Sequence, residues 1–237
     1  MSIPSSLSLV QLHSGQMQVF QSPHRFKVVC AGRRWGKSRL SISTIIRAAA
    51  KERKQRVWYV APTYQMARQI LWDDLQEVLP RKWIRKKNDT TMTIVLKNGS
   101  EIALKGADKP DTLRGVALHF VVLDEFQDMK PDTWYKVLRP TLSSTRGGAL
   151  IIGTPKGFSE FHKLWTIGQN KELQRKGQWK SWQFVTADSP FVPTAEIEAA
   201  KNDMDPKSFA QEYLASFENM SGRVYYPFDR SVHVKPL

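Results

Sequence analysis

The sequence predicts an α/β protein with a mostly parallel sheet flanked by helices and a small helical segment near its C-terminal end. Three observations support this fold class. Short apolar runs alternate with longer stretches of helical period, as in strands joined by crossover helices. The 237 residues, 41% of them hydrophobic, are enough for one large core. No apolar run approaches the length that spans a bilayer, and the first residues lack the pattern of a signal peptide.

The predicted strands are short apolar runs bounded by turn or helix signals. They cover Phe26–Ala31, Arg56–Ala61, 119–124, 149–153 and 180–186. The turn signal Asn98-Gly99 joins 91–96 to 101–105 as a β-hairpin. Helical patterns cover 38–51, 64–78, 132–138, 194–204 and 205–218.

The charge balance favours a polyanionic partner. Lysine and arginine total 36 against 22 acidic residues, a formal net charge of +14, although solvated lysines produce the same excess in many proteins. The densest basic run, RKWIRKK at 81–87, is predicted to be a solvated or DNA-facing surface. Cys30 is the single cysteine, so an internal disulfide is excluded, and we expect a small buried apolar role for it in a reducing compartment.

Residues 31–38, AGRRWGKS, match the Walker A pattern GxxxxGK[ST] with alanine at the first glycine. The match follows a predicted strand and precedes a predicted helix, so backbone amides and a helix N-terminus can face phosphates. Lys37 is expected to neutralise phosphate oxygens and Ser38 to bind magnesium. Gly36 must be small where the chain passes a phosphate, whereas the variable positions can turn outwards. The alternative is an ordinary basic loop.

Residues 121–126, VVLDEF, form an apolar strand that ends in two carboxylates. In a phosphate-loop ATPase, Asp124 would bind magnesium through its water shell and Glu125 would orient the attacking water. Two solvated acids at a strand end are the alternative. Together with the Walker A match, this Walker B pattern predicts hydrolysis of ATP with Mg²⁺. The predicted ATP-binding residues in the loop are Gly32, Arg33, Arg34, Trp35, Gly36, Lys37 and Ser38.

Arg114 follows a polar, turn-rich connection and precedes Gly115. A guanidinium here can reach a phosphate as an arginine finger, in its own subunit or a neighbouring one. Most loop arginines have no such role.

The motifs HSGQ (13–16), AGRRWGKS, VAPTY (60–64), LRG (113–115), VVLDE and IIGTPKG (151–157) occur in this order. Their combination resembles the large terminase subunits of tailed double-stranded DNA phages, whose N-terminal ATPase powers genome packaging into a procapsid. The resemblance implies a RecA-like P-loop fold of the ASCE class.

The resemblance also assigns roles to individual residues. Gln16 would read the adenine edge, and VAPTY would help to wall the base. Arg33 would sense the γ-phosphate, Arg114 would act in trans across a ring of subunits, and Thr154 would couple hydrolysis to movement. The alternative for Thr154 is a hydroxyl that caps a strand end. Trp35 is expected to project away from the phosphates and pack on the outer side of the loop, where a subunit contact is one place for it.

The implied partners are double-stranded DNA, the portal protein and the small terminase subunit, within a homo-oligomeric ring on the procapsid in the host cytoplasm. We expect an ATPase domain over 1–190 and a lid or linker over 191–237. Large terminases usually continue into an RNase H-like nuclease, and we expect that domain to be missing from this chain, with 222–237 as a connector towards it.

The sequence leaves two other functions open. A helicase-like DNA-dependent ATPase would need a second RecA-like lobe, and the residues after Thr186 are too few for one. An ATP-binding assembly module without turnover would have no need of Glu125.

Overall fold

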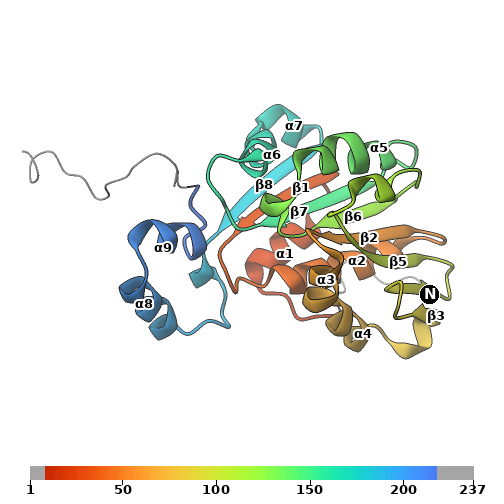
Figure 1. Ribbon diagram of the computed structural model, residues 1–237, viewed down its shortest axis with the longest axis horizontal. Helices are drawn as coiled ribbons and strands as arrows, with labels where there is room; N and C mark the ends of the chain where they lie inside the picture. The colour runs from red at the N-terminus through yellow and green to blue at the C-terminus, as the bar shows by residue number, and fades with distance from the viewer. Residues whose placement is uncertain (1–8, 218–237) are drawn as a thin grey trace, which may run out of the picture.

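The structure, a computed structural model, describes residues 9–217 and contains one eight-stranded sheet with helices on both faces (Figure 1). The strand order is β3-β4-β5-β2-β6-β7-β1-β8. The neighbouring strands in the part β5-β2-β6-β7-β1-β8 all pair in parallel, whereas β4 is antiparallel to both β3 and β5. The strands are β1 (Phe26–Ala31), β2 (Arg56–Ala61), β3 (Ile84–Asn88), β4 (Thr93–Leu96), β5 (Glu101–Gly106), β6 (Phe120–Leu123), β7 (Gly148–Gly153) and β8 (Trp179–Phe184).

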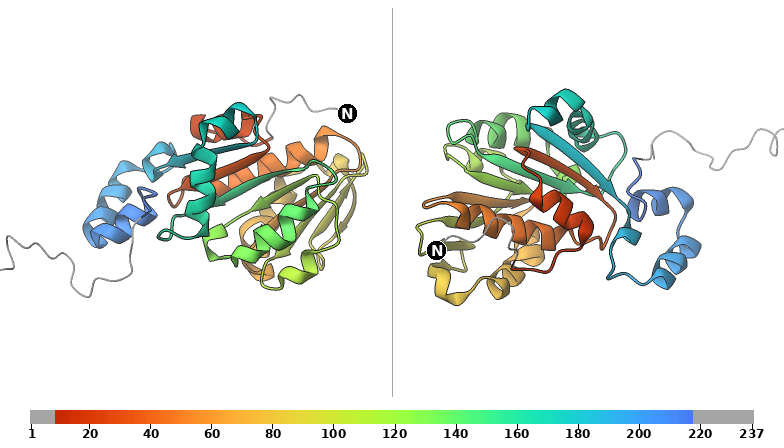
Figure 2. Two further views of the ribbon diagram at one scale, coloured as in Figure 1. Left: turned by 90° about the horizontal axis from the view of Figure 1, so that it is seen from above. Right: turned by 180° about the vertical axis from the view of Figure 1, so that it is seen from behind.

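Helices cover both faces of the sheet, as Figure 2 shows from above and behind. One face carries α1 (Ser14–Gln21), α2 (Lys37–Lys51) and a continuous helix made of α3 (Tyr64–Ala67), the π-helical η1 (Arg68–Trp72) and α4 (Asp73–Val78). The other face carries the π-helical η5 (Thr133–Leu138), the adjoining α5 (Arg139–Thr141) and α6 (Glu160–Gln169). The short α7 (Lys171–Arg175), which has no buried residue, lies between α6 and β8 in the chain. No helix of the described residues is long and apolar enough to cross a membrane.

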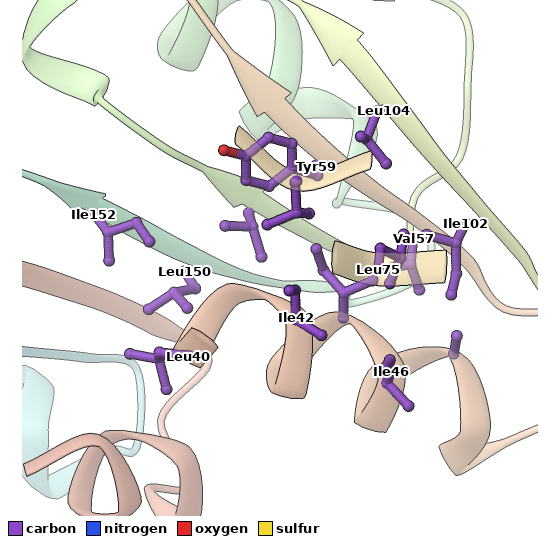
Figure 3. Packing of buried hydrophobic residues seen from close by; sticks show 14 of the residues in the cluster. Leu40, Ile42, Ile46, Val57, Tyr59, Leu75, Ile102, Leu104, Leu150 and Ile152 are labelled. Carbon is purple, nitrogen blue, oxygen red and sulfur yellow. The ribbon is translucent and has the colours of Figure 1, made fainter. Parts of the chain in front are cut away.

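The alternation of side chains along each strand produces two hydrophobic clusters. Val29 of β1 belongs to the cluster beneath α2, whereas Val28 packs on the opposite face. Figure 3 shows Leu40 and Ile42 of α2 in the first cluster, together with Tyr59 of β2. Since both faces are covered, the central strands are buried along almost their whole length.

The predicted strands and the hairpin are confirmed. The hairpin is β4–β5, which joins the main sheet because β5 pairs in parallel with β2. The predictions missed α1, α6, α7 and β3. β3 covers the end of the basic run at 81–87 and continues to Asn88. Its exposed cations lie on the edge strand of the sheet, where charge discourages pairing with another sheet.

Two predicted elements were too long. β8 ends at Phe184, because Thr186 begins a short 3₁₀-helix, η6 (Thr186–Asp188). The helix predicted over 205–218 ends at Glu212 as α9 (Pro206–Glu212). Beyond it, Ala215 has a left-handed backbone with φ of 53°, and its carbonyl accepts hydrogen bonds from Cys30 and Gln183.

The two C-terminal helices, α8 (Thr194–Asp203) and α9, lie beyond the carboxyl end of β8 (Figure 1). The segment after α9 returns to the core, where the backbone nitrogen of Thr186 donates to the Tyr213 carbonyl over 2.8 Å. The expected connector at 222–237 lies outside the described residues. The short 3₁₀-helices are η2 (Arg81–Trp83), η3 (Pro110–Leu113), η4 (Phe126–Asp128) and η6.

Candidate active site

The Walker A loop connects β1 to α2, as predicted. Gly36 caps the N-terminus of α2 in a left-handed conformation, with φ of 104°. A Cβ at this position would lie 2.3 Å from Nε2 of Gln16, so glycine is required by both the backbone and the packing. Gly32 also lacks room for a side chain, because an added Cβ would lie 2.5 Å from Oγ1 of Thr186.

Lys37 lies at the centre of the site. Its ammonium donates to the carbonyls of Ala31 and Gly32, over 3.2 and 3.4 Å, and to the hydroxyl of Thr154 over 3.0 Å. Thr154 directly follows β7, and β7 pairs with β1 so that Gly153 lies opposite Cys30. The carboxyl ends of these two parallel strands therefore bring together two residues that are far apart in the sequence.

Asp124 follows β6, on the other side of β7. Its side chain is 2% exposed and accepts hydrogen bonds from the Tyr59 hydroxyl over 2.7 Å and from the Glu125 backbone nitrogen over 2.9 Å. Burial and the neighbouring Glu125 charge raise the pKa of Asp124 to about 6, although Tyr59 and the Lys37 charge act in the opposite direction. The site thus combines the Lys37 ammonium with the carboxylates of Asp124 and Glu125 at the carboxyl ends of the central strands.

Glu125 is half-buried and has a left-handed backbone, with φ of 50°. One oxygen of its carboxylate, Oε2, accepts a hydrogen bond from Nε2 of Gln127 over 2.6 Å. A non-glycine residue in this backbone region is uncommon, and such residues concentrate at functional sites.

The hydroxyl of Ser38 and the carboxylate of Asp124 are hard oxygen donors, which suit Mg²⁺. Within residues 9–217, no group of three or more His, Cys, Asp and Glu side chains could hold a metal ion. A magnesium ion held by Ser38 and Asp124 would therefore complete its coordination with phosphate oxygens and water, as is usual at nucleotide sites.

Trp35 was expected to pack on the outer side of the loop, with a subunit contact as one place for it, and the structure buries it inside this chain instead. Its ring is fully buried within this chain, stacked on Phe184 at 4.6 Å between centroids and edge-on to His13 at 5.0 Å. Gln16 is also fully buried. Its Nε2 donates to the Gly36 carbonyl over 2.8 Å, and its Oε1 accepts from the His13 backbone nitrogen over 3.0 Å.

The three arginines that were expected to act on the nucleotide, Arg33, Arg34 and Arg114, have different surroundings. Arg33 and Arg34 are exposed on the loop, and the Arg33 guanidinium pairs with the Glu212 carboxylate at the end of α9. Among the described residues, Arg114 has no hydrogen bond or ion pair with Lys37 or Thr154. Its Nε donates to Asp111 over 2.8 Å, and it lines an open hollow of about 350 Å³ with residues of η5 and α5.

The family model described as "Terminase large subunit, T4likevirus-type, N-terminal" matches residues 28–231. The large terminase subunit of Escherichia phage T5 is 31% identical over 218 residues, which cover 90% of this chain and 49% of that protein. That of Thermus phage G20c is 32% identical over 259 residues, covering 92% and 51%. The chain belongs to the terminase large-subunit family. It spans about half the length of these curated relatives.

Solved structures place this terminase chain with ATPase domains of the family. The large terminase ATPase domain of Thermus phage P74-26 has a TM-score of 0.74 and 26% identity, covering 88% of this chain and 94% of that one. The large terminase of a thermophilic bacteriophage in complex with ATP-γ-S has a TM-score of 0.72 at 18% identity, covering 95% and 58%. The fold of this terminase domain is therefore the RecA-like fold that the resemblance implied.

Sequence reasoning missed several residues of the terminase site. Tyr59 is a polar residue inside the apolar run RVWYVA, a weak signal that it bonds a buried partner. Gln127 follows Glu125 by two residues, but nothing in the sequence shows that its amide turns back to the carboxylate. Glu212 lies far along the chain from Arg33, so only the fold brings the two together.

Proposed function

We propose that this chain hydrolyses ATP with Mg²⁺ and that hydrolysis drives translocation of double-stranded DNA into a procapsid. The observation that carries the proposal is the meeting of Lys37, Thr154 and the Asp124–Glu125 pair where β1, β7 and β6 end. Membership of the terminase large-subunit family supports it.

The roles of the residues follow from their chemistry. The backbone amides of the loop and the Lys37 ammonium bind the phosphates. Ser38 and Asp124 would hold magnesium, which supplies positive charge against the phosphate oxygens. Glu125 accepts a hydrogen bond from the attacking water and orients it towards the γ-phosphorus. The new P–O bond forms as the bond to the ADP oxygen breaks, so the products are ADP and phosphate.

The remaining residues serve nucleotide sensing and assembly in this proposal. Gln16 reads the adenine edge if its amide breaks the hydrogen bond to the Gly36 carbonyl and forms one with the base instead. Arg33, Arg34 and the loop around Trp35 respond to the γ-phosphate, and Thr154 couples hydrolysis to movement. Arg114 acts on the nucleotide of a neighbouring subunit in a ring.

The proposed partners are DNA, the portal protein and the small terminase subunit, in the cytoplasm of the host. The net charge of +14 supports binding to a polyanion. Residues 1–190 form the ATPase domain, and 191–237 form a lid or linker.

Replacement of Glu125 tests the proposal. Glu125→Ala should bind ATP with unchanged affinity but hydrolyse it roughly 10²- to 10⁴-fold more slowly, because the water loses its orienting group. Phosphate release and binding of a fluorescent ATP analogue are measured together, with the exposed Glu172→Ala on α7 as the control. Undiminished turnover in Glu125→Ala would remove this residue from the mechanism, and ATP binding without turnover in the wild type would favour an assembly module.

DNA dependence is tested with ATPase rates at increasing DNA and salt concentrations. Stimulation by DNA should fall steeply as salt rises, because phosphate contacts release counterions. Rates that do not respond to DNA would argue against a DNA-translocating motor.

A further inference from the structure

Gln127 of η4 lies between the Glu125 carboxylate and the end of β7. Its Nε2 donates to Oε2 of Glu125 over 2.6 Å and approaches Oδ2 of Asp128 at 3.3 Å. Its Oε1 is buried without a hydrogen-bond partner among the described residues, directly against Gly153. A Cβ added to Gly153 would lie 2.1 Å from that oxygen. The Gln127 amide therefore packs directly against the backbone of β7, and a side chain at Gly153 would have to displace it.

The segment that follows β7 contacts both halves of the site. Thr154 accepts the hydrogen bond from Lys37 over 3.0 Å, and Lys156 pairs with Asp128 over 2.8 Å. Asp128 is the residue next to Gln127 in the chain. The end of β7 and the segment after it therefore contact the lysine that binds phosphate and the residues that surround Glu125.

We propose that Gln127 is a positioning residue for Glu125. The inference rests on the proposed function, in which Glu125 orients the attacking water. By donating to Oε2 of Glu125, the Gln127 amide restricts rotation of the Glu125 carboxylate. The other carboxylate oxygen, Oε1 of Glu125, is then left to accept a hydrogen bond from water. Since orientation of a reacting group contributes to the rate, the bond raises kcat without contributing to nucleotide binding.

The first experiment removes the amide while keeping the length of the side chain. Gln127→Met should lower kcat by about 10- to 100-fold, the effect of losing one hydrogen bond to a charged group, and leave the Kd for a fluorescent ATP analogue unchanged. Gln127→Ala serves as a second variant if methionine disturbs the fold, and thermal melting of each apoprotein is recorded. Gln169→Met is the matched control. It removes the hydrogen bonds that the Gln169 amide, at the end of α6, donates to the hydroxyl and carbonyl of Ser181 in β8, and it should leave kcat unchanged.

The second experiment tests the packing against β7. Gly153→Ala should displace the Gln127 amide and lower kcat in the wild-type background. It should have little further effect in the Gln127→Ala background, because the shortened side chain leaves room for the methyl group. Equal effects in the two backgrounds would show that Gly153 does not act through Gln127, and would overturn the inference.

The outcomes separate this inference from the function on which it rests. Wild-type turnover that depends on Glu125, together with an unchanged or raised kcat in Gln127→Met, overturns only the positioning role. A fall in kcat that is matched by weaker ATP binding also overturns it, since the amide would then support the nucleotide site as a whole. Absence of turnover in the wild type overturns both.

Discussion

The ammonium of Lys37 lies 3.0 Å from the hydroxyl oxygen of Thr154, so the phosphate loop is joined directly to the end of β7. The contact exists because β7 pairs with β1, with Gly153 opposite Cys30. A phosphate that binds the Lys37 ammonium would compete with the Thr154 hydroxyl for the hydrogen bonds that this ammonium donates. In the proposed function, this competition would link nucleotide binding to the segment after β7.

Thr154→Val should bind ATP about 2- to 10-fold more tightly than the wild type, because Lys37 loses an acceptor that competes with phosphate. Thr154→Ser retains the hydroxyl and should keep the wild-type affinity. Titration with a fluorescent ATP analogue measures both variants. Weaker binding by Thr154→Val would contradict the competition.

Tyr59→Phe should lower the free energy of unfolding by about 1–3 kcal/mol, because the buried Asp124 carboxylate loses a hydrogen bond. Tyr135→Phe is the matched control. It also removes a hydroxyl bond to a carboxylate, that of Glu160, but at a residue 45% exposed, and should cost less than about 0.5 kcal/mol. Urea denaturation measures both variants. Equal losses would show that burial of Asp124 does not strengthen the Tyr59 bond.

Arg114 should act on the nucleotide of a neighbouring subunit. The ATPase rate per subunit should therefore rise with protein concentration, and Arg114→Ala should lower it. A mixture of Arg114→Ala and Glu125→Ala subunits should be more active than either variant alone, because each supplies the group that the other lacks. Arg175→Ala, on the exposed α7, is the control. A mixture no more active than its components would count against action in trans.

Lys27 should make the stability of the protein depend on pH. Its ammonium is buried against the Val19 carbonyl, and burial, together with the Arg47 charge, lowers its pKa to about 7. Between this value and its ordinary pKa of 10.5, the unfolded chain binds more protons than the folded chain. Folding stability should therefore rise with pH in this range, by up to about 1.4 kcal/mol per pH unit.

Lys27→Met should remove this contribution, so the variant should gain stability relative to the wild type most strongly near pH 7 and least near pH 10. Chemical denaturation at pH 7, 8.5 and 10 measures the difference, with the exposed Lys51→Met as the control. A difference between Lys27→Met and the wild type that does not change with pH would show that Lys27 keeps its ordinary pKa in the fold.

The sequence by itself determined the local features of this protein. The Walker A motif needs only a strand, a short loop and a helix in succession, and the pair Asp124–Glu125 needs only an apolar strand before it. These features follow from periodicity and turn chemistry over a few residues, so the α/β class, the hairpin and the core strands were predictable. Helices α6 and α7 were missed, and the aromatic and charged residues in 160–175 obscured their apolar faces.

The tertiary structure decided which residues meet. The order β6-β7-β1 brings Thr154 to Lys37, and the neighbouring β2 brings Tyr59 to Asp124. It also buries Trp35 against Phe184 rather than at a subunit contact. Sequence patterns record which face of a strand is apolar, but not which strands become neighbours. That choice depends on the packing of the whole sheet and its helices, and it sets the surroundings of every residue in the site.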